Sequence, residues 1–211
     1  MSNLPKFRRF RDYALQSPWQ FSRFVTTKDE HDALNPVKRF PWVPHHKAFF
    51  EEIQAGEIVF VPKSRQLKVT WLMCIYCLWM AKKYLHRLIY VQSKKAEDAE
   101  MLVFSGGKSK NWDTARISFI ESHLPEWLRD HPEPSSSPSR LVYGNGSIIQ
   151  AIPQGGDMIR SKVPSLVFSD EAAFQPEFSD AYTAMLPICK QGGQLVAVSS
   201  ANPSFFGQVA G

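Results

Sequence analysis

The sequence predicts an α/β fold in which helices flank a mostly parallel β-sheet. Its 211 residues are enough for one domain with a buried core. Hydrophobic residues make up 44% of the chain and charged residues 21%, which is typical of globular proteins. Apolar runs of strand length alternate with longer helical segments, and this alternation is typical of a parallel sheet that is covered on both faces.

Four nearly continuous apolar runs are expected to form strands, at residues 57–62, 87–93, 165–170 and 194–200. The segment SRLVYGNGSIIQAI is different, because two β-rich runs meet there at Gly144-Asn145-Gly146. A glycine- and asparagine-rich turn between two such runs is typical of a hairpin. We therefore expect a β-hairpin beside the parallel strands.

Helices are expected between the strands. HKAFFEEIQAG predicts a short helix that ends at Gly56, a common C-terminal stop. Further helices are expected at about residues 70–84, 95–104 and 177–186, the last of them ended by Pro187. Residues 104–112 and 130–139 are rich in glycine, serine or proline, which predicts loops.

The distribution of charge divides the chain into two parts. Residues 1–45 are expected to form a basic N-terminal extension, and residues 46–211 the main domain. The formal net charge of +5 would suit nucleic acid or another phosphate-rich partner. A solvated surface with extra lysines explains this charge equally well, so the charge alone decides little.

The cysteines and the apolar segments indicate neither a disulfide framework nor a membrane protein. The three cysteines are an odd number, and the pair Cys74-x-x-Cys77 lies within the apolar stretch WLMCIYCLWMA. Core packing therefore explains this pair better than a redox or zinc site does. The longest apolar stretch, at residues 71–81, is too short to span a bilayer, and the N-terminus lacks the apolar region of a signal peptide. We expect an intracellular location.

The stretch VFVPKSRQLKVTWL, at residues 59–72, has the layout of a phosphate-binding loop. An apolar strand is followed by a basic loop and then by Thr70 at the start of a predicted helix. The usual loop, G-x-x-x-x-G-K-[ST], has glycines and a lysine directly before the hydroxyl residue, whereas this stretch has no glycine and Val69 in the lysine position. Candidate phosphate ligands are Lys63, Arg65 and Lys68. On this loop alone, a basic turn without function is equally plausible.

Two further strands end in polar residues that could serve the same site. SLVFSDEAAF ends in Asp170 and Glu171, of which the first could hold Mg²⁺ and the second could deprotonate an attacking water. QLVAVSSANP ends in Ser199, Ser200 and Asn202, small polar groups that could reach a phosphate or its attacking water. The carboxyl ends of parallel strands form one sheet edge, where α/β proteins bind ligands.

Together these stretches resemble the ATPase domain of the large terminase subunit, the DNA-packaging motor of tailed bacteriophages. In that family the loop often reads K-x-R-Q-x-G-x-[ST], and PKSRQLKVTW matches it except for Lys68, which stands where the family has glycine. VFSDEAAF matches the family's acidic strand motif, and VSSANP matches the motif that couples hydrolysis to movement. YGNGSIIQAIP followed by Ile159-Arg160 extends the match, which covers about residues 46–206.

The resemblance implies a P-loop NTPase-like fold and a site for ATP and Mg²⁺. Thr70 and Asp170 would hold the metal, Glu171 would activate water, and Arg160 would be an arginine finger acting within or between subunits. Ser199, Ser200 and Asn202 would form the coupling motif. The residues expected to contact the ATP phosphates are Lys63, Ser64, Arg65, Gln66, Lys68 and Thr70.

The resemblance also implies partners. They are double-stranded DNA, a portal protein, a small terminase subunit and further copies of the chain in a ring, all in the host cell cytoplasm. Residues 1–211 contain no counterpart of the family's nuclease domain, so no nuclease activity is expected of them. Two other functions remain open on the sequence: a helicase-like ATPase that depends on nucleic acid, and a DNA-binding or assembly module without catalysis.

Overall fold

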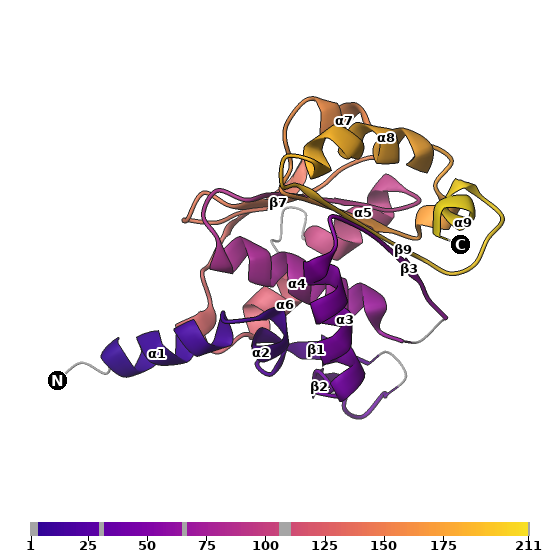
Figure 1. Cartoon of the computed structure of the whole chain (residues 1–211). Helices are drawn as coiled ribbons and strands as arrows, with labels where there is room; N and C mark the ends of the chain where they lie inside the picture. Colours follow the sequence, from indigo (N-terminus) through magenta and orange to yellow (C-terminus); the bar gives the residue numbers. More distant parts are fainter. Residues whose placement is uncertain (1–3, 30–31, 65–66, 106–110, 211) are drawn as a thin grey trace.

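The computed structural model describes residues 4–29, 32–64, 67–105 and 111–210. Within them the chain forms an α/β fold around one seven-stranded sheet, with helices on both faces (Figure 1). The strand order is β3-β9-β8-β4-β7-β6-β5, and the first five strands are parallel. This arrangement confirms the predicted fold class.

The parallel strands coincide with the predicted apolar runs. They are β3 (Ile58–Pro62), β4 (Leu88–Gln92), β8 (Leu166–Asp170) and β9 (Gln194–Ser199), with β7 (Ile148–Ala151) as the fifth. β8 and β9 are buried along their whole length, which explains their lack of polar alternation. The predicted hairpin is also confirmed, because β6 (Ser139–Val142) pairs antiparallel with β7.

Two groups of helices cover the sheet, one on each face. One face packs against α4 (Val69–Lys83), α5 (Ala96–Val103) and α6 (Arg116–His123). The other face carries α7 (Asp157–Arg160), α8 (Phe178–Cys189) and α9 (Phe205–Ala210), seen above and to the right of the sheet in Figure 1. Each group of helices encloses its own apolar clusters against the sheet, so the central strands are buried on both faces.

The segment before the sheet packs into the same core as α4. It contains α1 (Leu4–Ala14), α2 (Pro18–Ser22), β1 (Thr26–Lys28), β2 (Val37–Arg39) and α3 (Pro44–Ala55). Ala14 and Phe21 are fully buried in the main cluster, and the Trp79 indole nitrogen of α4 donates a hydrogen bond of 3.0 Å to the Leu15 carbonyl. α1 projects outward at its N-terminal end (Figure 1).

Charged groups join α1 to the end of α4. The Lys82 side chain is completely buried and forms ion pairs with Glu121, at 2.8 Å, and with Asp130, at 2.9 Å. Asp130 also accepts a hydrogen bond of 2.7 Å from Arg11 of α1. A buried lysine is stable only when it is paired in this way.

The cysteines pack as the sequence predicts. Cys74 and Cys77 are free thiols that lie fully buried within α4, and Cys189 is buried in α8. Burial raises the pKa of Cys74 to about 12, so this thiol stays protonated at neutral pH and behaves as a small apolar group. In the described part of the chain, no helix is long and apolar enough to cross a membrane.

Two local predictions were wrong, and one helix was not predicted. Residues 133–136 form an edge strand, β5 (Glu133–Ser136), instead of a loop; an edge strand tolerates Pro134 because only one of its sides is paired. α8 does not end before Pro187 but continues to Cys189, since burial of Ile188 and Cys189 offsets the missing backbone hydrogen bond. The third difference is α6, which no helical signal in the sequence had indicated.

Candidate functional site

The polar ends of three neighbouring strands meet at one edge of the sheet. β9 lies between β3 and β8, so the residues after Pro62, Asp170 and Ser199 come together. The backbone nitrogen of Lys63 donates a hydrogen bond of 2.8 Å to the Ser199 carbonyl, which continues the strand pairing beyond β3. Parallel sheets bind ligands at this carboxyl edge.

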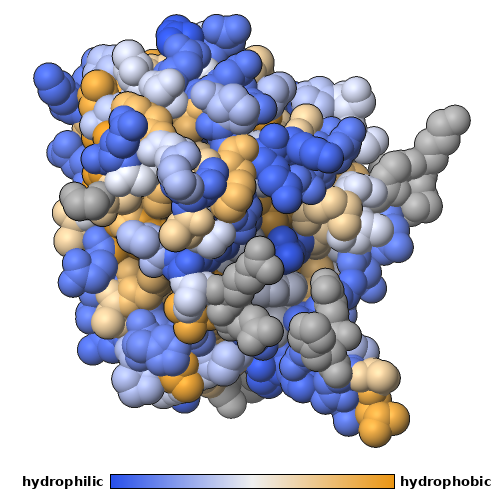
Figure 2. Space-filling model, turned by 90° about the vertical axis from the view of Figure 1, so that its right-hand side faces the viewer, coloured by the Kyte–Doolittle hydropathy of each residue, from blue (hydrophilic) through white to orange (hydrophobic). Residues whose placement is uncertain are grey.

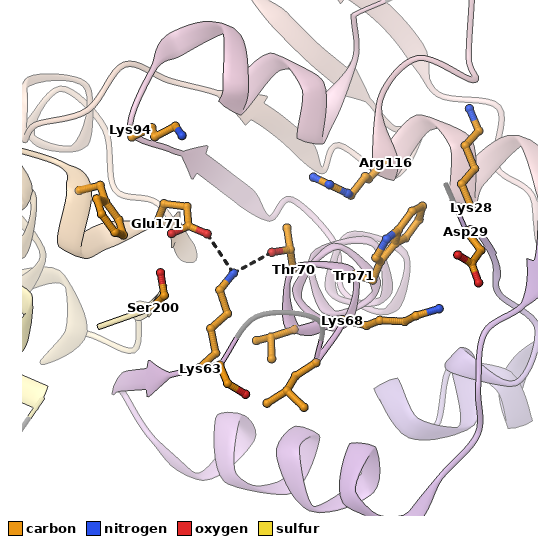
Figure 3. A pocket seen from close by; sticks show the side chains of 14 residues that line it. Lys28, Asp29, Lys63, Lys68, Thr70, Trp71, Lys94, Arg116, Glu171 and Ser200 are labelled. Carbon is orange, nitrogen blue, oxygen red and sulfur yellow. Dashed lines mark hydrogen bonds and ion pairs between the residues drawn. The ribbon is translucent and has the colours of Figure 1, made fainter. Parts of the chain in front are cut away.

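The Lys63 ammonium is the centre of this cluster (Figure 3). Its nitrogen lies 3.1 Å from the Thr70 hydroxyl and 3.2 Å from an Asp170 carboxylate oxygen. Glu171 completes the cluster with an ion pair of 3.4 Å. The Thr70 hydroxyl also lies 3.2 Å from both oxygens of Asp170. Four predicted residues from two distant parts of the sequence are therefore in contact.

Asp170 is the most deeply buried carboxylate of this cluster. Its side chain is only 9% exposed, whereas that of Glu171 is 31% exposed. Burial raises the pKa of Asp170, and the neighbouring Lys63 ammonium opposes this rise. A buried carboxylate beside a hydroxyl offers two hard oxygen ligands, which is the donor set that Mg²⁺ prefers. Elsewhere in the described residues, no cluster of three histidine, cysteine or acidic side chains could hold a metal.

The backbone at Lys68 has the conformation expected of the glycine that this position lacks. Lys68 precedes the first residue of α4 and has a φ of 54°, in the left-handed region. Lysine adopts this region at a cost, whereas glycine adopts it freely. α4 therefore starts as it would behind a glycine, and its first residues, Val69, Thr70 and Trp71, line the pocket. Arg65 and Gln66 lie outside the described residues.

Glu171 is held in a left-handed conformation too, and the end of β9 fixes the segment after it. Glu171 has a φ of 53° and leads into the short helix η3 (Ala172–Phe174). The Ser199 hydroxyl accepts a hydrogen bond of 3.1 Å from the backbone nitrogen of Ala173. The Asn202 amide donates one of 2.9 Å to the Ala173 carbonyl. Both predicted polar residues thus bind the peptide groups next to Glu171.

These residues border a pocket with a volume of about 680 Å³. The predicted site residues that line it are Lys63, Ser64, Lys68, Thr70, Glu171 and Ser200. Figure 2 views the molecule from the side on which the carboxyl ends of β3 and β9 lie, and this face is mostly hydrophilic with scattered apolar residues. The pocket lining is rich in cations, as a phosphate site should be.

Sequence reasoning missed several lining residues, namely Lys28, Asp29, Trp71, Lys94 and Arg116. Lys28 and Asp29 come from the N-terminal segment, and Arg116 is the first residue of α6. Lys94 follows β4, the neighbour of β8, so its place at the carboxyl edge could have been inferred from strand order. No local pattern pointed to Arg116, because only the packing of α6 on α4 brings it to the pocket.

Comparison with solved structures gives matches that cover most of the chain. The large terminase of bacteriophage HK97 superposes with a TM-score of 0.65 over 94% of this chain, at 14% sequence identity. The ATPase domain of the large terminase of Thermus phage P74-26 matches with a TM-score of 0.53 over 72% of this chain and 62% of that domain, also at 14% identity. A mutant of the same domain gives 0.58 over 79% of this chain and 69% of the domain.

This chain has the fold of large-terminase ATPase domains. It spans 40% of the length of the HK97 terminase. No protein-family model matches the sequence, and no curated protein matches it. The likeness is therefore one of fold, and what the terminase-like chain does must be argued from its own site.

Arg160 lies apart from the pocket of this terminase-like fold. It ends α7 and forms a two-pronged ion pair with Asp180 of α8, with a distance of 3.1 Å between Nη1 and Oδ2. It also lies 3.3 Å from Asp157. These pairs raise the pKa of Arg160 and lower that of Asp180. The pocket lining in the described residues does not include Arg160, so its role as an arginine finger stays a prediction.

Proposed function

We propose that this chain is an ATP-hydrolysing motor domain of a viral DNA-packaging terminase. One observation carries the proposal: the Lys63 ammonium lies within 3.4 Å of Thr70, Asp170 and Glu171 at the carboxyl edge of the sheet. A cation for phosphates, a pair of oxygen ligands for a metal and a carboxylate base are the parts that phosphoryl transfer to water requires.

Lys63 and the start of α4 would bind the phosphates of ATP. The ammonium carries the charge, and the unpaired N–H groups of the first turn of α4 donate to phosphate oxygens. Thr70 and Asp170 would hold Mg²⁺, which neutralises charge on the β- and γ-phosphates when it is bound. When ATP binds, the Lys63 ammonium, which lies within 3.4 Å of Thr70 and Glu171, would contact the phosphates.

Glu171 would act as the general base. Its carboxylate is 31% exposed, so water can reach it, whereas Asp170 beside it is nearly closed off. In the reaction a water oxygen bonds to the γ-phosphorus while the bond from that phosphorus to the bridging oxygen of ADP breaks. Glu171 takes the proton that the water loses. ADP and inorganic phosphate are the products.

Double-stranded DNA would be the substrate that the motor moves. The net charge of +5 favours a partner with a phosphate backbone. The further partners we propose are a portal protein, a small terminase subunit and neighbouring copies in a ring, within the host cell cytoplasm. DNA contacts of this type are mainly to phosphates, so binding should weaken steeply as salt concentration rises.

Replacing Glu171 by Gln tests the proposal. The parent chain should bind ATP with Mg²⁺ and hydrolyse it slowly as a monomer, because an arginine from a neighbouring subunit would be absent. Glu171→Gln keeps the size of the side chain but cannot take a proton, so hydrolysis should fall by about a hundredfold or more. The affinity of Glu171→Gln for ATP, measured by calorimetry, should stay within about threefold of that of the parent. The affinity of Lys63→Ala for ATP should fall by about tenfold or more.

Duplex DNA in the same assay separates the alternatives. A packaging motor should hydrolyse ATP faster with duplex DNA and should not separate the strands, whereas a helicase-like ATPase would separate them. An assembly module would bind DNA without any turnover. Parent-like hydrolysis by Glu171→Gln would remove Glu171 as the base, and failure of the parent to bind ATP would overturn the proposed function.

A further inference from the structure

Arg116 enters the pocket from a different direction from Lys63. It is the first residue of α6, and its side chain lines the pocket together with Thr70 and Glu171. In Figure 3 the Thr70 hydroxyl lies between the Lys63 ammonium and the Arg116 guanidinium, and the guanidinium is directed into the pocket. In this view, Lys63 and Arg116 thus approach the pocket from opposite sides of the Thr70 side chain, in the first turn of α4.

Aromatic packing holds Arg116 in this orientation. The centre of its guanidinium lies 5.7 Å from the centre of the Trp71 ring, a distance typical of a cation–π contact. Trp71 packs edge-on against Phe119 of α6, with 6.2 Å between the ring centres. Because Phe119 follows Arg116 by about one helical turn, α6 both carries the arginine and buttresses the ring beneath it.

Arg116 differs from Lys63, Lys82 and Arg160 because no ion pair with a carboxylate is found for it among the described residues. Lys82 and Arg160 each pair with two carboxylates, and Lys63 pairs with Asp170 and Glu171. Among the described residues, Arg116 has neither an ion pair nor a hydrogen-bonding partner, although it is half-buried. A guanidinium held in a fixed direction without a partner is ready to accept an anion from the pocket.

Arg116 lies at the catalytic end of the pocket, whose lining it shares with Thr70 and Glu171. Asp170 and Thr70 would hold the metal, and Glu171 would hold the attacking water, so this end is where the last phosphate of a nucleotide must lie. The guanidinium fork matches the oxygens of a phosphate.

We propose that Arg116 contacts the terminal phosphate of a bound nucleoside triphosphate, from within the same subunit. This inference rests on the proposed function and adds to it a residue that distinguishes ATP from ADP. A contact to the terminal phosphate strengthens binding of the triphosphate only, since ADP has no group at that place. It would also offset the charge that develops on the transferred phosphoryl group.

The affinities of a non-hydrolysable ATP analogue and of ADP, each with Mg²⁺, test the inference. In Arg116→Gln the analogue should bind about ten- to a hundredfold more weakly, because a charged hydrogen bond is lost, while ADP affinity should change less than about threefold. The affinity of Arg116→Lys for the ATP analogue should lie between those of the parent and of Arg116→Gln, since lysine keeps the charge but not the planar fork.

Lys28→Gln is the matched control for charge. Lys28 lines the same pocket, but its ammonium is already engaged: it donates to the Asp113 carbonyl and lies 4.7 Å from the centre of the Phe119 ring. Its removal takes away one positive charge without removing a free guanidinium. Any loss of affinity in Lys28→Gln should therefore be equal for the ATP analogue and for ADP.

Two outcomes would overturn the inference. Equal losses for both nucleotides in Arg116→Gln would place the contact at the inner phosphates, and unchanged affinities would leave Arg116 a packing residue. Melting curves show whether Arg116→Gln is folded; if it is not, the more conservative Arg116→Lys decides by the same comparison. A parent chain that binds neither nucleotide would instead overturn the proposed function, and this inference would fall with it.

Discussion

Lys68 and Glu171, on opposite sides of the pocket, both have a backbone conformation that non-glycine residues avoid. Their φ angles are 54° and 53°. A side chain in this region costs roughly 1–2 kcal/mol, and such residues concentrate at functional sites, where the surrounding structure holds them in place. At Lys68 the constraint is the start of α4, and at Glu171 it is the turn from β8 into η3.

Substitutions at Lys68 should reveal this conformational cost. Lys68→Gly and Lys68→Ala both remove the side chain, but only glycine relaxes in the left-handed region. Lys95 is the matched control, since it also precedes a helix, α5, but has an extended conformation with φ of −133°. In denaturant unfolding, the advantage of glycine over alanine should be about 1 kcal/mol larger at position 68 than at position 95.

The result also bears on the departure from the family's loop. An equal advantage of glycine over alanine at positions 68 and 95 would show that Lys68 is not strained in solution. If the strain is real, Lys68→Gly should keep or improve ATP affinity, because the glycine-like course of the backbone is retained. Figure 3 shows the Lys68 side chain directed away from the Lys63–Glu171 cluster, so its loss should matter less than that of Lys63.

At the scale of elements, the end of β9 positions the segment that follows Glu171, the proposed base. Ser199 and Asn202 bind the two sides of Ala173, within η3 and two residues beyond Glu171. Gln175, at the end of η3, donates hydrogen bonds of 2.9 Å to the Ser169 hydroxyl and 2.8 Å to the Asp170 carbonyl. The end of β9 and the start of η3 are therefore joined by hydrogen bonds, as expected of the predicted coupling motif.

Asn202→Ala should lower kcat by about tenfold or more, because a small displacement of Glu171 misplaces the attacking water. ATP affinity should change less than about twofold, since in the described part of the chain the hydrogen bonds of Asn202 join it to Ala173 and Ser204 and not to a proposed phosphate ligand. Asn202→Asp keeps the size of the side chain but replaces the amide donor by an oxygen. Its kcat should therefore be no higher than that of Asn202→Ala.

Ser204→Ala is the control for the Asn202 variants. Ser204 donates a hydrogen bond of 3.2 Å to the Asn202 carbonyl in the same turn, and this bond does not involve η3. Its kcat should equal that of the parent in a steady-state assay. A normal kcat in Asn202→Ala would show that the Asn202–Ala173 bond does not position Glu171.

At the scale of the whole molecule, Arg160 is a predicted catalytic residue that lies apart from the pocket. It is held by Asp180 and Asp157 between α7 and α8, with its side chain 47% exposed. Exposed ion pairs of this kind contribute little to stability. Arg160 is therefore free to change partners when a second copy of the chain approaches, as expected for an arginine that acts between subunits.

Mixing two inactive variants tests action between subunits. Arg160→Ala should lower kcat by about a thousandfold in the assembled protein, with a modest change in ATP affinity, since a finger stabilises charge only during the reaction. A mixture of Arg160→Ala and Glu171→Gln should recover part of the hydrolysis, because one kind of mixed interface holds both intact groups. No recovery under conditions where light scattering shows assembly would exclude this role.

The sequence by itself determined the parallel sheet and the centre of the site. Strands that are buried on both faces must be apolar throughout, and the polar residues at their ends mark the carboxyl edge of the sheet. For that reason Lys63, Thr70, Asp170 and Glu171 could be predicted from their places at strand and helix ends. The hairpin could also be predicted from a local signal, because Gly144-Asn145-Gly146 favours a tight turn between two strands.

Only the tertiary structure decided which residues from other elements complete the site. Arg116 and Lys28 reach the pocket because α6 and β1 pack beside α4, and such packing leaves no periodic or local signal in the sequence. The same holds for β5, whose proline and serines are tolerated because an edge strand is paired on one side only. Local chemistry specifies the ends of strands and helices, whereas contacts between distant elements depend on how the whole chain packs.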